Sequence, residues 1–153
     1  MLETNIDLKL FILGPIELNK IDLELLSQFI SKSSKILIED FQKDIRPFIS
    51  FSNCLVLPSY REGFPNVILE SGSMGKPVIM SNVYGSEEYI NNDNGLVYKI
   101  GDVNDLFDKM HYLYHNHDRY NPTLIRNNTI KYYSDVNVRQ ELDRFYTKTL
   151  QSI

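Results

Sequence analysis

The sequence predicts an α/β fold with a parallel sheet of about five strands flanked by helices, and a helical carboxyl-terminal part. Short apolar runs of strand length alternate with segments whose apolar residues recur at helical spacing, which is typical of βαβ units. The last third of the chain keeps the helical spacing and has no further strand pattern. No change of composition, repeat or low-complexity linker divides the chain, so we expect a single domain over residues 1–153.

Each element follows from a local pattern. The strands are expected at residues 8–13, 35–38, 54–57, 77–80 and 95–98. The helices are expected at about residues 21–31, 44–51, 66–74 and 86–90, followed by terminal helices near 102–116, 121–133 and 135–150. The first helix has apolar residues at helical spacing, which predicts a core face formed by Ile21, Leu25, Leu26, Phe29 and Ile30.

Composition and charge exclude several classes of partner. The chain has 16 basic and 20 acidic side chains and a formal charge of −4, so no general attraction to nucleic acid or anionic lipid is expected. No signal peptide and no long apolar stretch is visible, which favours a cytoplasmic location, with attachment to a membrane surface as a variant. The single Cys54 lies in an apolar run and is interpreted as a buried core thiol.

The most informative segment for chemistry is residues 58–77, PSYREGFPNVILESGSMGKP. It follows an apolar strand and contains two glutamates, Glu62 and Glu70, eight positions apart. The Pro- and Gly-containing part before Asn66 predicts a loop, and Asn66 is a suitable N-cap for a helix that Gly75 would end. Glu62 should therefore lie on a loop and Glu70 on a helix.

A helix that begins just after the carboxyl end of a parallel strand directs unpaired N–H groups and its positive dipole end into a crevice, where a phosphate can bind. Carboxylates at Glu62 and Glu70 could then accept hydrogen bonds from sugar and ribose hydroxyls. The alternative is a chance spacing, in which a glutamate near a helix start only complements the dipole, an effect worth roughly 0.3–1 kcal/mol.

The whole string resembles the signature of the GT-B retaining glycosyltransferases of the group 1, family four type. The resemblance covers about residues 8 to 115, in the family's order. The matching segments are Glu62-Gly63-Phe64, Asn66-Val67-Ile68-Leu69-Glu70 and Gly75-Lys76-Pro77-Val78-Ile79, with Leu10 to Pro15 and Asp44 to Phe48 upstream and Asn94 to Val97 and Gly101-Asp102 downstream.

The resemblance implies transfer of a hexosyl-type sugar from a nucleotide diphosphate sugar to an acceptor hydroxyl with retention, in polysaccharide or glycoconjugate biosynthesis. It implies that Glu62 is the catalytic residue that binds and orients the transferred sugar, and that Glu70 holds the ribose. The other donor-binding residues implied are Gly63, Phe64, Asn66 and Val67. Pro65 stands where relatives commonly have glycine, which removes one N–H donor. The resemblance implies no cofactor and no metal, and an acceptor glycan or lipid-linked sugar as the second substrate.

The family's donor domain begins with a further strand and helix that carry an Arg and a Lys, and an acceptor-binding domain precedes it. This sequence begins at the next strand, so the resemblance implies an incomplete donor-binding half, a partner chain, or self-association through the last helix, where Leu142, Phe145, Tyr146 and Leu150 form an apolar stripe. Two alternatives stay open: a non-catalytic nucleotide-sugar-binding fragment or subunit, and a structural or interaction protein with an empty crevice.

Overall fold

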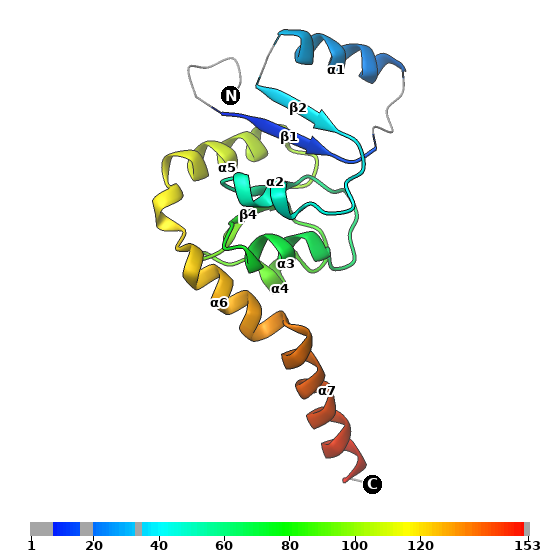
Figure 1. The fold of residues 1–153 in the computed structure, drawn as a ribbon, viewed down its shortest axis with the longest axis vertical. Coiled ribbons are helices and arrows are strands. Elements are labelled where there is room, and N and C mark those ends of the chain that lie inside the picture. The colour runs from blue at the N-terminus through cyan, green and yellow to red at the C-terminus, as the bar shows by residue number, and fades with distance from the viewer. Residues whose placement is uncertain (1–7, 16–19, 33–34, 152–153) are drawn as a thin grey trace. The chain divides into compact units, whose positions relative to one another are not determined.

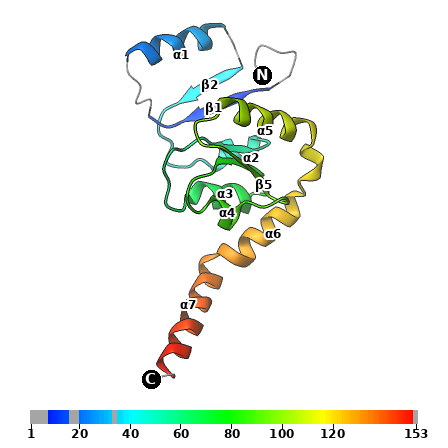
Figure 2. The ribbon, with the colours of Figure 1, turned by 180° about the vertical axis from the view of Figure 1, so that it is seen from behind.

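The computed structural model describes residues 8–15, 20–32 and 35–151 (Figures 1 and 2). By contacts the chain divides into two compact units, residues 1–48 and 49–153. Each unit is described by itself. The expectation of a single domain over residues 1–153 stays a prediction.

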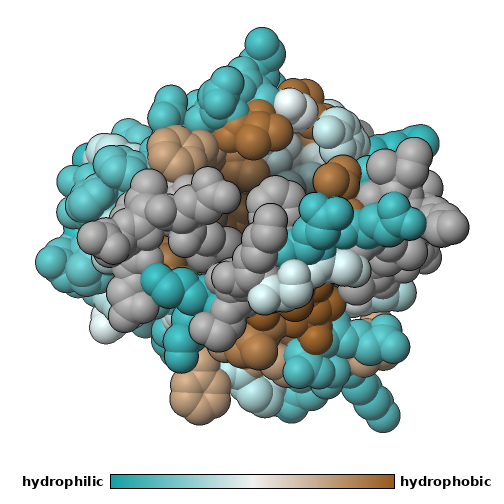
Figure 3. All heavy atoms as spheres, turned by 90° about the horizontal axis from the view of Figure 1, so that it is seen from above, coloured by the Kyte–Doolittle hydropathy of each residue, from teal (hydrophilic) through white to brown (hydrophobic). Residues whose placement is uncertain are grey.

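The amino-terminal unit contains a parallel strand pair and a helix. Its elements are β1 (Leu10–Leu13), α1 (Lys20–Lys32) and β2 (Ile36–Glu39), and α2 (Arg46–Phe51) begins at its end. The register pairs Leu10 with Ile36 through to Leu13 with Glu39. Apolar residues of this unit remain exposed, among them Phe41. Figure 3 shows apolar atoms (brown) at the surface seen from above, among hydrophilic ones.

Helix α1 confirms the predicted helix, and its apolar face is described only in part. The side chains of Ile21 and Phe29, two of the five residues predicted to form that face, lie outside the described part of the structure. Leu26 and Ile30 are partly buried, whereas Leu25 is 49% exposed. The described part of the predicted face is therefore only half covered.

The carboxyl-terminal unit is built on a three-stranded parallel sheet with the strand order β3-β4-β5. Its elements in chain order are β3 (Leu55–Leu57), α3 (Asn66–Ser73), β4 (Val78–Ser81), α4 (Ser86–Tyr89), β5 (Gly95–Tyr98), α5 (Val103–His115), a 3₁₀ turn (His117–Arg119), α6 (Pro122–Tyr133) and α7 (Asp135–Leu150). Every residue of β4, the central strand, is buried. Val78, Ile79 and Met80 are apolar on both faces of the sheet, as expected for a covered parallel strand, and Ser81 ends the strand.

These elements confirm the α/β class, the parallel strands and the helical carboxyl-terminal part. The five strands form one pair and one triplet, where the sequence suggested one sheet of about five. Strand pairing is a contact between distant segments, and the local pattern that reveals each strand carries no information on its neighbours.

Alternate residues of the three-stranded sheet pack into two core clusters. Val78 and Met80 join Ile68 of α3 and Tyr89 of α4 in one cluster. Ile79 faces the other way and packs with Leu113 and other residues from β5, α5 and α6. This is the alternation of side chains expected along a strand. Helices therefore cover both faces of the sheet, and the loops lie at the ends of its strands.

The last helix has none of its residues buried in the structure. Figures 1 and 2 show α7 continuing from α6 away from the sheet of its own unit. The predicted apolar stripe is present and exposed, with Leu142, Phe145, Tyr146 and Leu150 between 48% and 72% accessible. Among the described helices, none is both long enough and apolar enough to cross a membrane.

Candidate functional site

The segment singled out in the sequence lies at the carboxyl edge of the three-stranded sheet. Glu62, Gly63 and Phe64 are in the loop between β3 and α3, and Glu70 is on α3 itself. The loop after β4 lies beside them, because a Cβ added to Gly85 would be 3.1 Å from the Gly63 carbonyl oxygen and 3.5 Å from the Phe64 ring. Two neighbouring loops thus meet at the edge where ligands bind in open α/β sheets.

The carboxylate of Glu62 is held in place by its own loop. The hydroxyl of Ser59 donates a hydrogen bond of 2.6 Å to Glu62 Oε1. Ser59 is in turn fixed by its backbone carbonyl, which accepts a short hydrogen bond from the hydroxyl of Ser81 at the end of β4. Glu62 is partly buried, so one side of its carboxyl group is turned to Ser59 while the residue keeps contact with solvent.

Glu70 has a different environment. It is exposed on α3, one turn after the helix begins, and its backbone carbonyl accepts a hydrogen bond of 2.8 Å from Ser73. The structure therefore places Glu62 before the start of α3 and Glu70 just inside it, as the sequence predicted.

The start of α3 corrects one detail of the prediction. The N-cap is Pro65, in an extended conformation and without a side-chain hydrogen bond, and Asn66 is the first helical residue. The Pro65 carbonyl accepts the first bond, from the Ile68 N–H at 3.2 Å, which moves the cap one residue earlier. The amides of Asn66 and Val67 precede that first bond, and such N–H groups have no acceptor in their own helix. They can therefore donate to an external anion.

The end of α3 follows the prediction. Gly75 has a φ of 73°, a left-handed conformation that favours glycine. Its N–H donates to the Gly72 carbonyl and the N–H of Lys76 donates to the Ser71 carbonyl, which is the Schellman arrangement at a helix end.

The loop is anchored to the helices by an aromatic contact that the sequence did not indicate. The ring of Phe64 stacks on Tyr133 of α6 at a centroid distance of 5.9 Å. The Tyr133 hydroxyl donates a hydrogen bond of 2.8 Å to the Glu88 carbonyl of α4. Phe64 therefore acts here as an anchor of the loop, and its side chain is 36% exposed.

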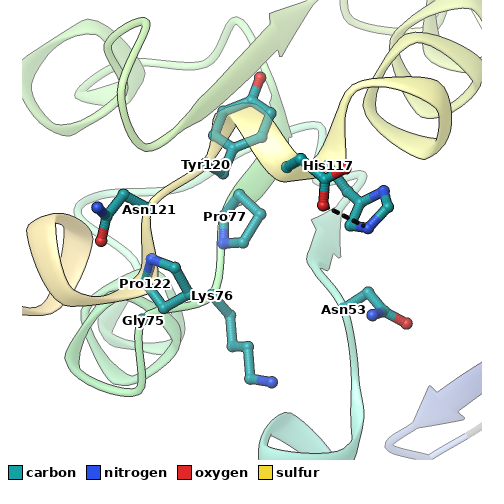
Figure 4. A pocket seen from close by; sticks show the side chains of 9 residues that line it. Asn53, Gly75, Lys76, Pro77, His117, Tyr120, Asn121 and Pro122 are labelled. Carbon is teal, nitrogen blue, oxygen red and sulfur yellow. Dashed lines mark ion pairs between the residues drawn. The ribbon is translucent and has the colours of Figure 1, made fainter.

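A larger cavity is lined by the last residues of this segment, Gly75 to Pro77, and by neither Glu62 nor Glu70. It has a volume of about 420 Å³ and is drawn in Figure 4. Its lining residues come from before β3, from the turn between α3 and β4, and from the 3₁₀ turn and the start of α6. They are Asn53, Gly75, Lys76, Pro77, His117, Asp118, Tyr120, Asn121 and Pro122. These residues lie at the amino edge of the sheet, opposite the loops just described. We therefore do not assign this cavity to the candidate site.

A smaller cavity of about 130 Å³ lies at the carboxyl edge, next to the loop of Glu62. Its lining is mainly apolar and aromatic and consists of Pro58, Tyr60, Tyr98, Gly101, Asp102, Val103 and Leu106. Tyr98 is almost fully buried, and burial raises the pKa of its hydroxyl group. Of the two cavities, this one adjoins the predicted residues.

Neither Cys54 nor the histidine pair His111 and His115 of α5 lines the smaller cavity at this edge. Cys54 packs against the core, and burial raises the pKa of its thiol to about 11, so it is not a reactive thiolate at neutral pH. His111 and His115 face each other, with 3.2 Å between their Nε2 atoms. Within the described residues, no three His, Cys, Asp or Glu side chains are grouped so that they could hold a metal ion.

Sequence comparison identifies a family. The model described as glycosyl transferases group 1 matches residues 1–116. The chain is 30% identical over 106 residues to the capsular polysaccharide biosynthesis glycosyltransferase CapM of Staphylococcus aureus, a match covering 68% of this chain and 28% of CapM. It is 34% identical over 70 residues to the UDP-Gal:alpha-D-GlcNAc-diphosphoundecaprenol alpha-1,3-galactosyltransferase of Escherichia coli, covering 45% of this chain and 18% of that enzyme. The matches thus span less than a third of these relatives.

Solved structures with the same fold include a galactosyltransferase and a protein in complex with UDP. The apo form of the lipopolysaccharide outer core galactosyltransferase WaaB aligns with a TM-score of 0.76 at 22% identity, over 92% of this chain and 41% of WaaB. Anabaena HepE in complex with UDP aligns with a TM-score of 0.77 at 19% identity, over 95% of this chain and 41% of HepE. At these identities the similarity establishes the fold.

Proposed function

Because the chain belongs to the glycosyl transferases group 1 family, we propose that it binds a nucleotide diphosphate sugar and serves in transfer of that sugar to an acceptor hydroxyl, with retention at the anomeric carbon. The observation that carries the proposal is the placement of two carboxylates on either side of the start of α3. Glu62 precedes the helix and is fixed by Ser59, and Glu70 follows one turn inside it. In the proposed complex the nucleotide sugar spans the two carboxylates, with its diphosphate between them.

In the proposed complex each group has one task. Glu70 accepts hydrogen bonds from the ribose hydroxyls, and Glu62 accepts them from the transferred sugar. The diphosphate lies at the start of α3, where the amides of Asn66 and Val67 donate to its oxygens. Gly63 and Phe64 belong to the same loop as Glu62, between β3 and α3. We assign no metal and no cofactor to this step.

The reaction breaks the bond between the anomeric carbon and the diphosphate oxygen and forms a bond from the same carbon to the acceptor oxygen. The proton of the acceptor hydroxyl passes to the departing phosphate. Negative charge grows on the diphosphate as the first bond breaks, and donors already aimed at it stabilise that charge most effectively. The start of α3 provides such donors without a net charge of its own.

The proposed acceptor is a glycan or a lipid-linked sugar. The relatives support this choice, because one is named for capsular polysaccharide biosynthesis and another for a diphosphoundecaprenol-linked sugar. All the residues assigned here act on the donor, so we propose that this chain supplies the donor-binding part of the reaction. Either a cytoplasmic location or attachment at a membrane surface is compatible with that role.

The test is a calorimetric titration of the purified chain with UDP, GDP and ADP and with their sugars. Glu70→Ala should weaken the binding of every nucleotide that the wild type binds, by about 1.5–3 kcal/mol of binding free energy, the range for hydrogen bonds to a charged group. Glu62→Ala should keep the affinity for the nucleoside diphosphate and lose the added affinity for its sugar. Glu141→Ala, an exposed glutamate of α7, is the matched control.

Two results would contradict the proposal. Equal dissociation constants for wild type and Glu70→Ala, measured on folded protein, would remove Glu70 from the site. Equal loss of both ligands in Glu62→Ala would contradict the division between sugar and nucleotide.

A further inference from the structure

Two serines connect the buried end of β4 to Glu62 by hydrogen bonds. Ser81 and Tyr98 are the last residues of β4 and β5, and the strand register pairs them directly. Residues paired directly on neighbouring strands point their side chains to the same face of the sheet, so Tyr98 lies beside Ser81. The Ser81 hydroxyl donates to the Ser59 carbonyl, and the Ser59 hydroxyl donates to Glu62 Oε1. The inner end of this connection is buried, because Ser81 is 0% exposed and Tyr98 beside it is 5% exposed.

From this geometry we infer that Ser59 is a positioning residue, which fixes the orientation of the Glu62 carboxylate so that it can bind the transferred sugar. The inference rests on the proposed function of Glu62. It adds a residue that touches Glu62 rather than the donor, and it connects the site to the end of β4.

The physical argument is one of orientation. A glutamate has three side-chain torsions, and ordering such a side chain costs conformational entropy. A loop carboxylate without a partner would pay this cost when the sugar binds. The bond from Ser59 fixes the carboxylate beforehand, and hydrogen bonds to a charged oxygen are among the stronger ones in proteins. The second oxygen of Glu62 remains to accept bonds from a sugar.

Ser59 is also well placed because its backbone is held independently of Glu62. The bond from Ser81 acts on the Ser59 carbonyl, not on its hydroxyl. Removal of the Ser59 hydroxyl therefore leaves the loop attached to β4 while it releases Glu62. This separation makes the positioning role testable without disruption of the fold.

The experiment compares Ser59→Ala, Ser59→Thr and wild type in calorimetric titrations with UDP and with UDP-glucose. The gain in affinity from the glucose group is the ratio of the dissociation constants for UDP and UDP-glucose. In Ser59→Ala this ratio should fall about 10- to 100-fold, as expected for loss of a hydrogen bond to a charged group. Its affinity for UDP should change by less than about twofold, because the nucleotide is held by Glu70 and by the start of α3. Ser59→Thr keeps the hydroxyl and should restore the added affinity. Ser52→Ala is the matched control, because the Ser52 hydroxyl donates to the backbone carbonyl of Ile49 and not to a carboxylate.

Crystal structures of wild type and Ser59→Ala without ligand supply a second measurement. We expect the Glu62 carboxylate to leave its position in Ser59→Ala while the backbone of residues 58–65 stays in place. A variant in which Glu62 keeps its orientation, or one that loses UDP and UDP-glucose equally, would overturn the positioning role. If wild type binds UDP but binds no UDP-sugar more tightly than UDP, the proposed function is contradicted. The crystal structures would then still decide the role of Ser59.

Discussion

Replacement of Gly72 by alanine should destabilise the carboxyl-terminal unit through a contact between α3, α4 and α6. A Cβ at this position would lie 1.7 Å from the Tyr89 hydroxyl and 2.5 Å from Thr129 Oγ1. These two atoms form a buried hydrogen bond of 2.9 Å. Thr129 Oγ1 also donates to the Ile125 carbonyl, so Tyr89 must donate to Thr129. The methyl group cannot enter unless Tyr89 moves and this bond breaks.

The magnitude follows from three terms. Overpacking of a core costs about 1–3 kcal/mol, and a buried hydroxyl without its partner costs about 1–3 kcal/mol. The gain of alanine over glycine in a helix offsets about 1 kcal/mol. The free energy of unfolding should therefore fall by about 3 kcal/mol, which corresponds to roughly 6–12 °C in the melting temperature of a protein of this size.

The assay is urea and thermal unfolding of Gly72→Ala beside Gly63→Ala. A Cβ at Gly63 would meet nothing within 4 Å, so that control should stay within about 0.5 kcal/mol of wild type. In a background carrying Tyr89→Phe and Thr129→Ala, both obstructing oxygens are gone and the nearest remaining atom is the ring Cζ at 3.1 Å. The cost of Gly72→Ala should then fall to about 1 kcal/mol or less, a coupling expected for side chains in contact. An equal cost in both backgrounds would refute the reasoning.

Two further predictions concern the core thiol and the loop after β4. Burial raises the pKa of Cys54 from 9.0 to about 11, so at pH 8 iodoacetamide should alkylate it roughly 100-fold more slowly in the folded chain than in urea, and equal rates would contradict its burial. Because the pKa of Cys54 is higher in the folded chain, the thiol of the unfolded chain loses its proton first as pH rises. The contribution of this thiol to the free energy of unfolding is therefore complete below about pH 9 and should be lost as pH rises to about 11, as measured by urea unfolding. Gly85 has a φ of 83°, and Gly85→Ala should cost about 1–2 kcal/mol of unfolding free energy and displace the adjacent loop at Gly63, whereas an unchanged urea midpoint would contradict the strain.

The secondary structure could be predicted from the sequence because each element has a local signal. The run Val78–Ser81 is apolar enough to indicate a buried strand, and Gly75 followed by Pro77 indicates the end of α3. The position of the cap at Pro65 was missed by one residue, because the cap is defined by which carbonyl accepts the first helical bond, and that depends on the path of the loop.

The partners of the site residues could be predicted only in part. Ser59 lies three residues before Glu62, so the motif itself contains the signal for that contact. Tyr98 gives no such signal, because its approach to Ser81 depends on the register of β4 and β5. The anchoring of Phe64 by Tyr133 joins residues 69 positions apart in the chain, and no local pattern links two residues at that separation. Contacts of this kind become visible when the strands and helices are placed in space.

The two carboxylates of the site are supported in different ways, and the difference fits the tasks proposed for them. Glu70 is exposed on a regular helix, whose backbone alone places the side chain near the start of α3. Ribose hydroxyls lie away from the bond that breaks, so small changes in this contact alter affinity more than rate. Glu62 lies on a loop, where backbone position is less fixed, and groups near a reacting centre need placement within about 0.5 Å. The hydrogen bonds from Ser59 and Ser81 supply that placement from the buried end of β4, so the less ordered element receives the stronger support.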